Sequence, residues 1–317
     1  MNPGKLVLAR TVANAAYHGR IPDELAERLP DTVCSAHLVA DRRGSRVWWI
    51  RLQNGPSLAL KYCQPDRTDV GGVRPHTAEL AVREAAVLST MAGDNPTLLD
   101  PGHLYAHGRA GDGSWIAVRW LQNPNLRQTW SRCQRTGGKA RTLMVQSACA
   151  AAQVVAHMHK GGWYHGDLQA EHVLYLRGRA RLIDYAWTQG PVDIAPMVPY
   201  RGGWGPVTAP EISAQLLHTP PDHNIPLTSS SEVYTLAAVW HHLWTGRHAR
   251  ALPGGDHETV DLAGVYKAIC AESTLRLVDL EPAGLRHLVT EMLAHNPADR
   301  PPIDEVADRL AFLSQRT

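Results

Sequence analysis

The apolar residues at the start of the chain change their spacing along the sequence. Residues 2–28 have the spacing of a helix, interrupted at Pro22, which predicts a short helical extension. From His37 onward the spacing is that of strands, and the dipeptide Asn54-Gly55 between two strand-like runs predicts a β-hairpin. The chain is therefore expected to change from helix to sheet before this hairpin.

Helical spacing returns over residues 76–91, and two more strand-like runs follow it, one in HLYAHG and one in WIAVRWL. Together with the hairpin, they predict a small sheet accompanied by one helix. Beyond Leu121 the spacing is mostly helical, and short strands are expected only beside two acidic motifs, around Asp167 and Asp184. The sequence therefore predicts an α+β protein whose second part is mainly helical.

Composition and charge narrow the classes of protein that fit. The chain has 317 residues, of which 44% are hydrophobic, which is long for one core but sufficient for two. Its 32 basic and 30 acidic residues are interspersed and leave a net charge of +2, which argues against a nucleic-acid partner. The five cysteines are scattered and lack the spacing of a metal site, so reduced thiols in a cytosol are expected. No apolar run reaches the roughly 18 residues of a membrane span, and the first residues do not resemble a secretory signal. We therefore expect a cytoplasmic protein with no membrane partner.

The candidate chemistry lies in the two acidic motifs, HGDLQAEHVLYL from His165 and RLIDYAW around Asp184. Both acids are expected at strand ends or in loops, aimed at one cleft. There Asp167 can accept the proton of an attacking hydroxyl, while Asp184 can hold Mg²⁺ against nucleotide phosphates. Taken alone, the same residues also fit a β-hairpin with acidic turns.

Further segments follow one another in an order similar to that of the eukaryotic-like protein kinases of bacteria, and the similarity runs from about Ala36 to the C-terminus. The segments are GSRVW with Gly44, LALKYC with Lys61, REAAVL with Glu84, the two acidic motifs, TAPE with Glu211, SSEVYTL with Glu232, and HNPADRPP with Arg300. The resemblance implies a bilobal, protein-kinase-like α+β fold. It divides the chain into an N-terminal helical extension (1–35), a small lobe with an antiparallel sheet and one helix (36–120), and a larger, mainly helical lobe (121–317).

The resemblance assigns the nucleotide to residues of the smaller lobe. Lys61 would contact the α- and β-phosphates of ATP and pair with Glu84, and Gly44, Val118 and Trp120 would line the same site. The family usually has several glycines in the loop that covers the phosphates, whereas this chain has only Gly44 there. ATP binding is therefore expected to be weaker or organised differently.

Charged residues near this site leave alternatives open. Arg42, Arg43 and Arg46 would either contact phosphate through their side chains or form a charged hairpin tip that faces solvent. Glu79 shares the helix of Glu84, but the spacing within REAAVL favours Glu84 as the partner of the strand lysine.

Four departures of the acidic motifs from the family pattern have physical consequences. Gly166 replaces an arginine that pairs with a phosphate on the activation segment, so control by phosphorylation of that segment is not expected. Gln169 replaces a lysine and can donate a hydrogen bond without carrying charge. His172 replaces the metal-binding asparagine, and it would either ligate a metal, for which Mn²⁺ suits it better than Mg²⁺, or hydrogen-bond Asp167 or a phosphate. Ala186 replaces a glycine, so this segment is expected to stay in one state.

Residues of the second part bear on the acceptor. Glu211 and Arg300 resemble a buried ion pair that antibiotic phosphotransferases, which share the HGD motif, usually lack. Glu232 stands where the family has an aspartate that holds the backbone of the catalytic loop. Trp204 lies in a loop rich in Gly and Pro, either as a shelf for a peptide or as a plug. The ion pair favours a protein kinase over a small-molecule kinase.

The sequence is therefore interpreted as that of an ATP-dependent phosphotransferase that modifies a Ser or Thr hydroxyl on a protein or peptide. Asp167 would be the base, assisted by Gln169, while Asp184 with His172 would hold Mg²⁺ or Mn²⁺. By fold-level analogy, the substrate would be a precursor peptide of lanthipeptide-like biosynthesis, with a lyase as partner enzyme. Two other interpretations stay open: a pseudokinase that acts as a binding or scaffold module and, third, a small-molecule kinase of the aminoglycoside type.

Overall fold

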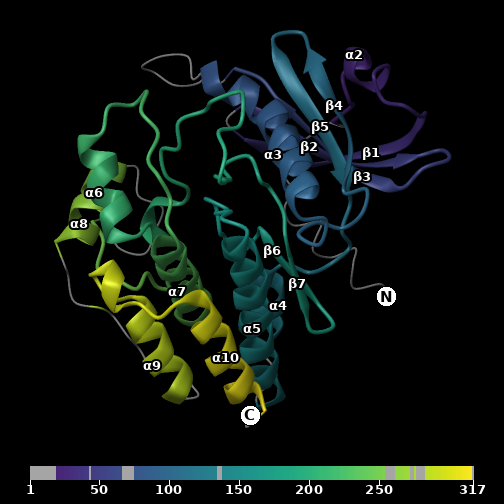
Figure 1. Cartoon of the computed structure of the whole chain (residues 1–317). Coiled ribbons are helices and arrows are strands. Elements are labelled where there is room, and N and C mark those ends of the chain that lie inside the picture. Colours follow the sequence, from purple (N-terminus) through teal and green to yellow (C-terminus); the bar gives the residue numbers. More distant parts are fainter. Residues whose placement is uncertain are drawn as a thin grey trace. The chain divides into compact units, whose positions relative to one another are not determined.

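The structure is a computed structural model in which the chain forms two units (Figure 1). It describes residues 19–42, 44–65, 75–133, 138–253, 261–271, 275 and 283–315. Unit 1 comprises the described residues up to Gln122 together with Ile194–Val198, and unit 2 comprises the other described residues from Asn123 onward. Residues 1–18, which include much of the predicted helical extension, lie outside the described residues.

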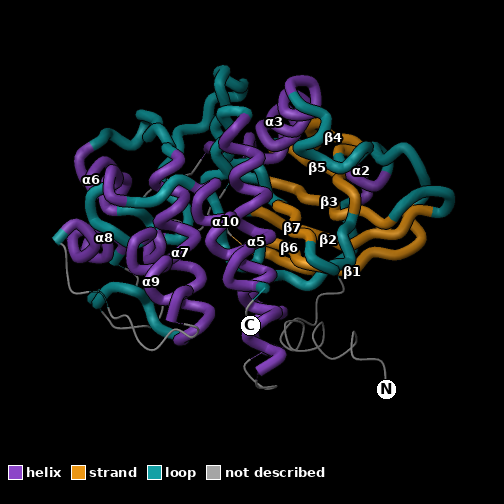
Figure 2. Tube along the Cα trace, turned by 60° about the horizontal axis from the view of Figure 1, so that its bottom comes forward, coloured by secondary structure: helices purple, strands orange, loops and turns teal. Residues whose placement is uncertain are grey.

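Unit 1 contains the predicted antiparallel sheet, which has five strands in the order β1-β2-β3-β5-β4 (Figure 2). The strands are β1 (Val33–Arg42), β2 (Ser45–Leu52), β3 (Ser57–Cys63), β4 (Leu104–Ala110) and β5 (Gly113–Arg119). The predicted hairpin is confirmed between β2 and β3, where the N–H of Asn54 in the turn donates to Asp31 Oδ2 over 2.8 Å. The first strand begins before His37, where the spacing changes, because its first residues pair with the end of β2.

The two faces of this sheet differ in what covers them. One face carries buried apolar side chains, namely Trp48, Ile50, Leu58, Leu60 and Tyr62. The segment around the short helix α2 (Asp23–Ala26) covers it through Ile21, Leu25 and Leu29. Because neighbouring residues of a strand point to opposite faces, Lys61 points to the other face, with Val47 and Ile116 beside it in register. The described part of the N-terminal extension therefore belongs to the core of unit 1.

The helix predicted over residues 76–91 is confirmed as a 3₁₀ turn, η1 (Pro75–Glu79), followed by α3 (Leu80–Asp94). Small and apolar residues at helical spacing, among them Ala81 and Ala85, are buried where α3 contacts the sheet. Small side chains allow the helix to approach the strands closely. Glu84 lies next to Ala85 and is also buried, so the packing of α3 brings this carboxylate toward the sheet.

Unit 2 is mainly helical, as predicted. Its elements are α4 (Leu126–Cys133), α5 (Gly138–Lys160), β6 (Val173–Leu176), β7 (Arg179–Leu182), η2 (Gly205–Val207), α6 (Pro210–His218), α7 (Ser229–Thr245), α8 (Leu262–Cys270), α9 (Ala283–Met292), η3 (Pro297–Asp299) and α10 (Ile303–Ser314). A capping box of Thr228 and Ser231 begins α7, and Gly246 with a φ of 69° ends it. The helices α5 and α10 lie side by side (Figures 1 and 2). No helix in the described ranges has the length and apolar composition that spanning a membrane requires.

The short strands predicted beside the acidic motifs are confirmed as the hairpin of β6 and β7. Its two-residue turn, Arg177-Gly178, has positive φ angles of 51° and 81°, as in the type I′ turn that matches the twist of paired strands. Asp167 lies in the loop before β6, and Asp184 follows the end of β7. The hairpin turns the chain back on itself, so the two acids lie beyond the same end of it.

Candidate active site

The loop of His165, Gly166 and Asp167, the HGD loop, depends on glycine at its middle position. Gly166 has a φ of 81°, and a Cβ atom there would lie 2.6 Å from the carbonyl oxygen of Trp187. Any larger side chain would therefore require the backbone to move. An arginine, which the resemblance would place here, does not fit this backbone.

The predicted contact between Glu232 and the backbone of the HGD loop is present. The N–H of Gly166 donates to Glu232 Oε1 over 2.7 Å, at a position where Glu232 is buried. Burial alone would raise the pKa of Glu232, but the hydrogen bond and charge of His159, together with the Gly166 N–H, outweigh burial and hold that pKa below its ordinary value. The ionised carboxylate therefore fixes the start of the loop.

Sequence reasoning missed two members of this network. Nε2 of His159 on α5 lies 2.8 Å from Glu232 Oε2, and its Nδ1 lies 2.9 Å from Ser229 Oγ. The hydrogen bonds thus form a chain from Ser229 through His159 and Glu232 to the N–H of Gly166. One local pattern in the sequence indicates that Ser229 lies near Glu232. Both residues stand in the first turn of α7, where residues three apart are neighbours.

His165 is buried. The N–H of Asp167 donates to its Nδ1, and its Nε2 lies 3.2 Å from the carbonyl oxygen of Ile183, so Nε2 carries the proton. Burial lowers the pKa of His165 and keeps the ring neutral. This ring therefore joins the HGD loop to the residue that precedes Asp184.

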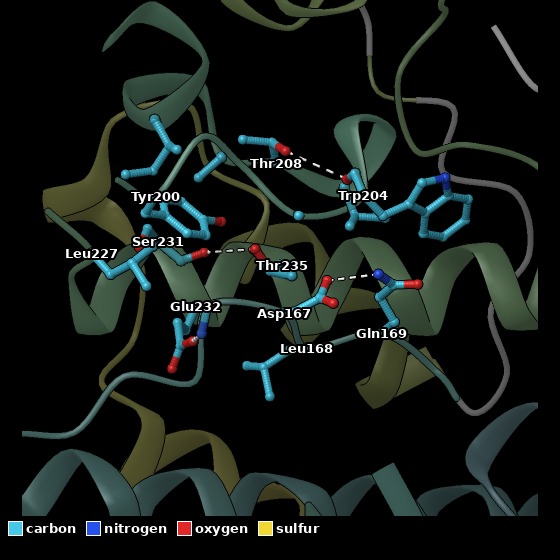
Figure 3. Close-up of a pocket in the computed structure, with 15 residues that line it drawn as sticks. Asp167, Leu168, Gln169, Tyr200, Trp204, Thr208, Leu227, Ser231, Glu232 and Thr235 are labelled. Carbon is cyan, nitrogen blue, oxygen red and sulfur yellow. Dashed lines mark hydrogen bonds between the residues drawn. The ribbon is translucent and has the colours of Figure 1, made fainter. Parts of the chain in front are cut away.

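The carboxylate of Asp167 contacts two side chains of its own loop. Gln169 Nε2 donates to Oδ1 over 2.6 Å (Figure 3). His172 Nδ1 lies 3.3 Å from Oδ2. The backbone of Gly203 also lies close to this carboxylate. A Cβ atom on Gly203 would lie 2.6 Å from Asp167 Oδ1, so only glycine allows this approach. Gln169, predicted as an uncharged donor, therefore orients the proposed base.

His172 lies between the two acidic motifs. Its Nδ1 donates to the carbonyl oxygen of Asp167 over 2.9 Å, and its Nε2 lies 3.8 Å from Asp184 Oδ2. Asp184 has a φ of 66°, a conformation that is sparsely populated outside glycine and that clusters at functional sites. Of the alternatives predicted for His172, the contact with Asp167 is present. The structure therefore brings Asp167, His172 and Asp184 together.

This group has donors suited to a divalent cation that binds together with a nucleotide. The Asp184 side chain is 32% exposed, and a carboxylate oxygen is the ligand that Mg²⁺ prefers. Because Nδ1 of His172 donates to a carbonyl, Nε2 is the ring nitrogen directed at Asp184. Within the described parts of the chain, no three His, Cys, Asp or Glu residues form a cluster that could hold a metal ion. A cation here would therefore need further oxygen ligands, such as water molecules or a bound phosphate.

A small cavity of about 20 Å³ lies beside Asp167, with the side chains of Tyr200, Thr208 and Thr235 in its wall (Figure 3). A cavity of this size holds about one water molecule. Burial raises the pKa of Tyr200, and the charges of Asp167 and Glu232 raise it further, so the phenol stays protonated. The lining of the cavity therefore combines hydroxyl groups with the carboxylates of Asp167 and Glu232.

Trp204 packs against two stacked histidine rings of its own unit. The ring centroids of His242 and His248 are 4.9 Å apart with 14° between the planes, and Trp204 meets them edge-on at 5.0 and 5.5 Å. Burial lowers the pKa of His242 to about 4, and the neighbouring His248 contributes. Trp204 thus fills space over these rings, as a plug would, and one part of it also lines the cavity beside Asp167.

The predicted ion pair between Glu211 and Arg300 is present and bidentate. Arg300 Nη1 and Nη2 lie 2.7 and 2.8 Å from the two carboxylate oxygens of Glu211. The guanidinium also donates to the carbonyl oxygens of Ala294, Ser230 and His295. A buried charge with this many partners specifies geometry more than it adds stability. The pair therefore fixes how the start of α6 is held within unit 2.

In unit 1, the predicted ion pair between Lys61 and Glu84 is also present. Lys61 Nζ lies 3.1 Å from Glu84 Oε2, and both side chains are largely buried. Glu79, the competing acid, instead pairs with Arg109 at a more exposed position. The helix therefore presents Glu84 to the strand lysine, as the spacing indicates.

Val118 and Trp120 lie on the same face of the sheet as Lys61. Val118 stands opposite Ala59 in register, two positions from Lys61 along β3. Because the side chain of Ala59 is small, the rings of Trp49 and Trp120 come together beside it, with centroids 6.1 Å apart. This face is apolar, aromatic and half-buried around the lysine.

Gly44 turns β1 into β2 with a φ of 77°, and its carbonyl oxygen accepts from the N–H of Gln64 over 2.8 Å. This turn is the predicted covering loop. Arg42 is exposed at the end of β1, and Arg43 lies outside the described residues. The one glycine of the loop is thus needed for the turn itself.

Arg46 follows neither of the two roles predicted for it. Its guanidinium lies 5.7 Å from the ring of Trp48 and 5.8 Å from that of Tyr62, and it also donates to Gln64. Since Arg46 pairs with Tyr62 in register, it points to the sheet face opposite Lys61. Arg46 therefore packs on aromatic rings of the covered face.

The predicted site residues fall into two groups. Unit 1 contains Lys61, Glu84, Gly44, Val118 and Trp120, and unit 2 contains Asp167, Gln169, His172 and Asp184. Comparison of the sequence with models of known protein families finds no match, and neither does comparison with curated proteins.

Proposed function

We propose that the protein is an ATP-dependent phosphotransferase with a protein-kinase-like fold, which phosphorylates a Ser or Thr hydroxyl on a protein or peptide. The observation that carries the proposal is the position of His172, whose two ring nitrogens face Asp167 and Asp184. Phosphoryl transfer needs one carboxylate that accepts the hydroxyl proton and another that holds a cation against the phosphates. One imidazole between two such acids supports a shared site.

In the proposed reaction, the acceptor hydroxyl oxygen attacks the γ-phosphorus of ATP while the bond to the β–γ bridging oxygen breaks, and ADP leaves. The hydroxyl proton passes to the carboxylate of Asp167. The amide of Gln169 orients this carboxylate through Oδ1. The contact between Glu232 and Gly166 holds the loop backbone, so the base is positioned before the substrate arrives.

Asp184, assisted by His172, is the proposed ligand of Mg²⁺ or Mn²⁺. A bound divalent cation would neutralise charge on the phosphoryl oxygens. A nitrogen donor beside the carboxylate suits Mn²⁺ better than Mg²⁺. Transfer is therefore expected to be faster with Mn²⁺.

The proposed nucleotide contacts in unit 1 are Lys61 for the phosphates and the apolar sheet face for the adenine ring. Glu84 holds the ammonium group of Lys61 in place. Half-buried apolar and aromatic side chains, here Val118 and Trp120, are typical of sites for flat heterocycles. The single glycine at Gly44 is consistent with weak ATP affinity.

The proposed acceptor is a protein or peptide, such as a precursor peptide that a partner lyase then processes. The support is the bidentate pair of Glu211 and Arg300, which small-molecule kinases with an HGD motif usually lack. Trp204, beside the cavity next to Asp167, provides an aromatic surface at the proposed acceptor position.

The contacts of Asp167 support a second candidate, a catalytically inactive binding module. Both carboxylate oxygens already have partners in the loop, Gln169 and His172, and Asp167 is 9% exposed. A base held in this way must release one contact before it can accept a proton. An inactive module would keep these contacts permanently.

Incubation of the protein with labelled ATP, Mg²⁺ or Mn²⁺ and a library of Ser/Thr peptides separates the two candidates. Asp167→Asn should lower kcat by about 10²- to 10⁴-fold and leave ATP affinity within about threefold, because a general base contributes to the chemical step. Asp222→Asn is the matched control, because Asp222 also contacts an imidazole, that of His223 at 2.9 Å, but is exposed. ATP binding without transfer would favour the inactive module. Transfer by Asp167→Asn at close to the normal rate would contradict the assignment of the base.

A further inference from the structure

The stretch between Asp184 and Glu211 contains a short segment that belongs to unit 1. By its contacts, Ile194–Val198 groups with the sheet and α3, whereas the residues on either side of it group with unit 2. Ile194 and Val198 are 6% and 5% exposed. The segment therefore groups with unit 1 and is buried at its two end residues.

The side chain of Arg83 on α3 forms hydrogen bonds with the backbone of this segment. Its Nη1 donates to the carbonyl oxygen of Ile194 over 2.8 Å and to that of Pro196 over 3.3 Å. Arg83 is 7% exposed, and burial lowers its pKa. Burial of a guanidinium is costly unless acceptors surround it. The two carbonyl oxygens of the segment supply acceptors of the kind that a buried guanidinium needs.

Arg83 and Glu84 are consecutive residues of the same helix. Their side chains leave α3 about 100° apart, so one faces the segment while the other faces Lys61. A rotation of α3 that moves Glu84 away from Lys61 would also withdraw Arg83 from the two carbonyl oxygens. The two contacts are therefore geometrically coupled through the helix.

We infer that Arg83 is a positioning residue, which clamps Ile194–Val198 onto α3 and thereby sets the Lys61–Glu84 pair. The acceptors are backbone carbonyl oxygens, so the clamp needs no phosphate group. It gives a physical reason for expecting constitutive rather than phosphorylation-controlled activity. The effect on catalysis rests on the proposed function, whereas the clamp itself does not.

The test compares the full-length protein with Arg83→Gln and Arg83→Lys. Hydrogen–deuterium exchange of peptides that cover residues 190–200 reports the clamp, and the rate of modification of Lys61 by an amine reagent reports the ion pair. Arg83→Gln should exchange about tenfold faster in this segment, because a hydrogen bond to a charged donor is lost. Lys61 should then react faster, toward the rate seen in Glu84→Gln. Arg83→Lys keeps the charge and one donor group, so it should lie between wild type and Arg83→Gln in both measurements.

Arg109→Gln is the matched control, because Arg109 pairs with Glu79 at the exposed start of the same helix region. It should change neither measurement. Unchanged exchange of residues 194–198 in Arg83→Gln would overturn the clamp. Faster exchange with an unchanged rate at Lys61 would overturn the coupling. Neither readout requires phosphoryl transfer, so both results stand apart from a failure of the proposed function.

Discussion

The two groups of predicted site residues, one in each unit, are held in different ways. In unit 1, Lys61 and Glu84 are carried by a strand and a helix, and packing of these elements brings the charges into direct contact. In unit 2, Asp167 and Asp184 lie in loops, and Glu232 on α7, together with His159 on α5, holds the loop of Asp167. Charges on regular elements are thus positioned by the fold, whereas charges on loops need a separate network of buried polar groups.

The network in unit 2 is strong because all of its members are paired. Glu232 accepts from the Gly166 N–H and contacts His159, which in turn contacts Ser229. Removal of one buried member leaves the others without partners, which costs more than the removed hydrogen bond itself contributes. The loop residues of unit 2 are therefore expected to be more sensitive to substitution than the charges on regular elements in unit 1.

The largest expected effect is that of Glu232→Ala. The change removes a buried carboxylate from its two partners, so the free energy of unfolding should fall by about 3–5 kcal/mol, the range for breaking a buried charged pair. Urea titration followed by circular dichroism measures it. Glu291→Ala is the control, because Glu291 pairs with Arg309 while about one-third exposed, and there the loss should stay below about 1 kcal/mol. Equal losses in the two variants would remove the distinction between buried network and surface pair.

The features that could be predicted from the sequence are those that depend on the periodic spacing of apolar residues or on motifs of a few neighbouring residues. Alternation around Lys61 predicts a strand, helical spacing predicts the element that carries Glu84, and the hairpin explains why Asp167 and Asp184 end on the same side. The partnership of Glu211 and Arg300 came from the family resemblance. Each of these depends on neighbours in sequence or on a known motif.

The features that sequence reasoning missed depend on contacts between distant segments. The chain from Ser229 through His159 to Glu232 joins two helices, and no period of either helix indicates it. The side of the sheet on which Arg46 lies follows from its register with Tyr62, because one step along a strand reverses the direction of every side chain. Such contacts are set by tertiary packing, which local patterns do not specify.

The intermediate effect is expected in unit 1, for Glu84→Gln. The substitution keeps the shape of the side chain but removes its charge beside Lys61, so ATP affinity should fall about tenfold while the free energy of unfolding falls by only about 1–2 kcal/mol. Fluorescent-nucleotide binding and urea titration measure the two quantities. Glu79→Gln is the control and should leave nucleotide affinity unchanged, because Glu79 pairs with Arg109. A stability loss as large as that of Glu232→Ala would show that the two groups of residues depend equally on their charges.

The smallest effect concerns pH and the stacked rings of unit 2. The pKa of His242 is lowered to about 4, first by burial and then by the charges of His248 and Arg127, while Glu171 acts in the opposite direction. The unfolded chain takes up a proton on this ring near its ordinary pKa, about 6.5, before the folded protein does. Stability from the neutral ring is therefore fully present above pH 6.5 and is lost as the pH falls toward 4.

Because His242 is only partly buried, solvent screening should reduce this loss to on the order of 1 kcal/mol. His242→Gln removes the titrating ring, so its stability should decline less steeply than that of the wild type between pH 6.5 and 4. Urea midpoints at several pH values across this window measure the difference. His223→Gln, which removes an exposed imidazole, is the control and should follow the wild-type curve. If His242→Gln loses stability as steeply as the wild type, other groups carry the slope, and the loop network around the ionised Glu232, whose pKa is also lowered, becomes its source.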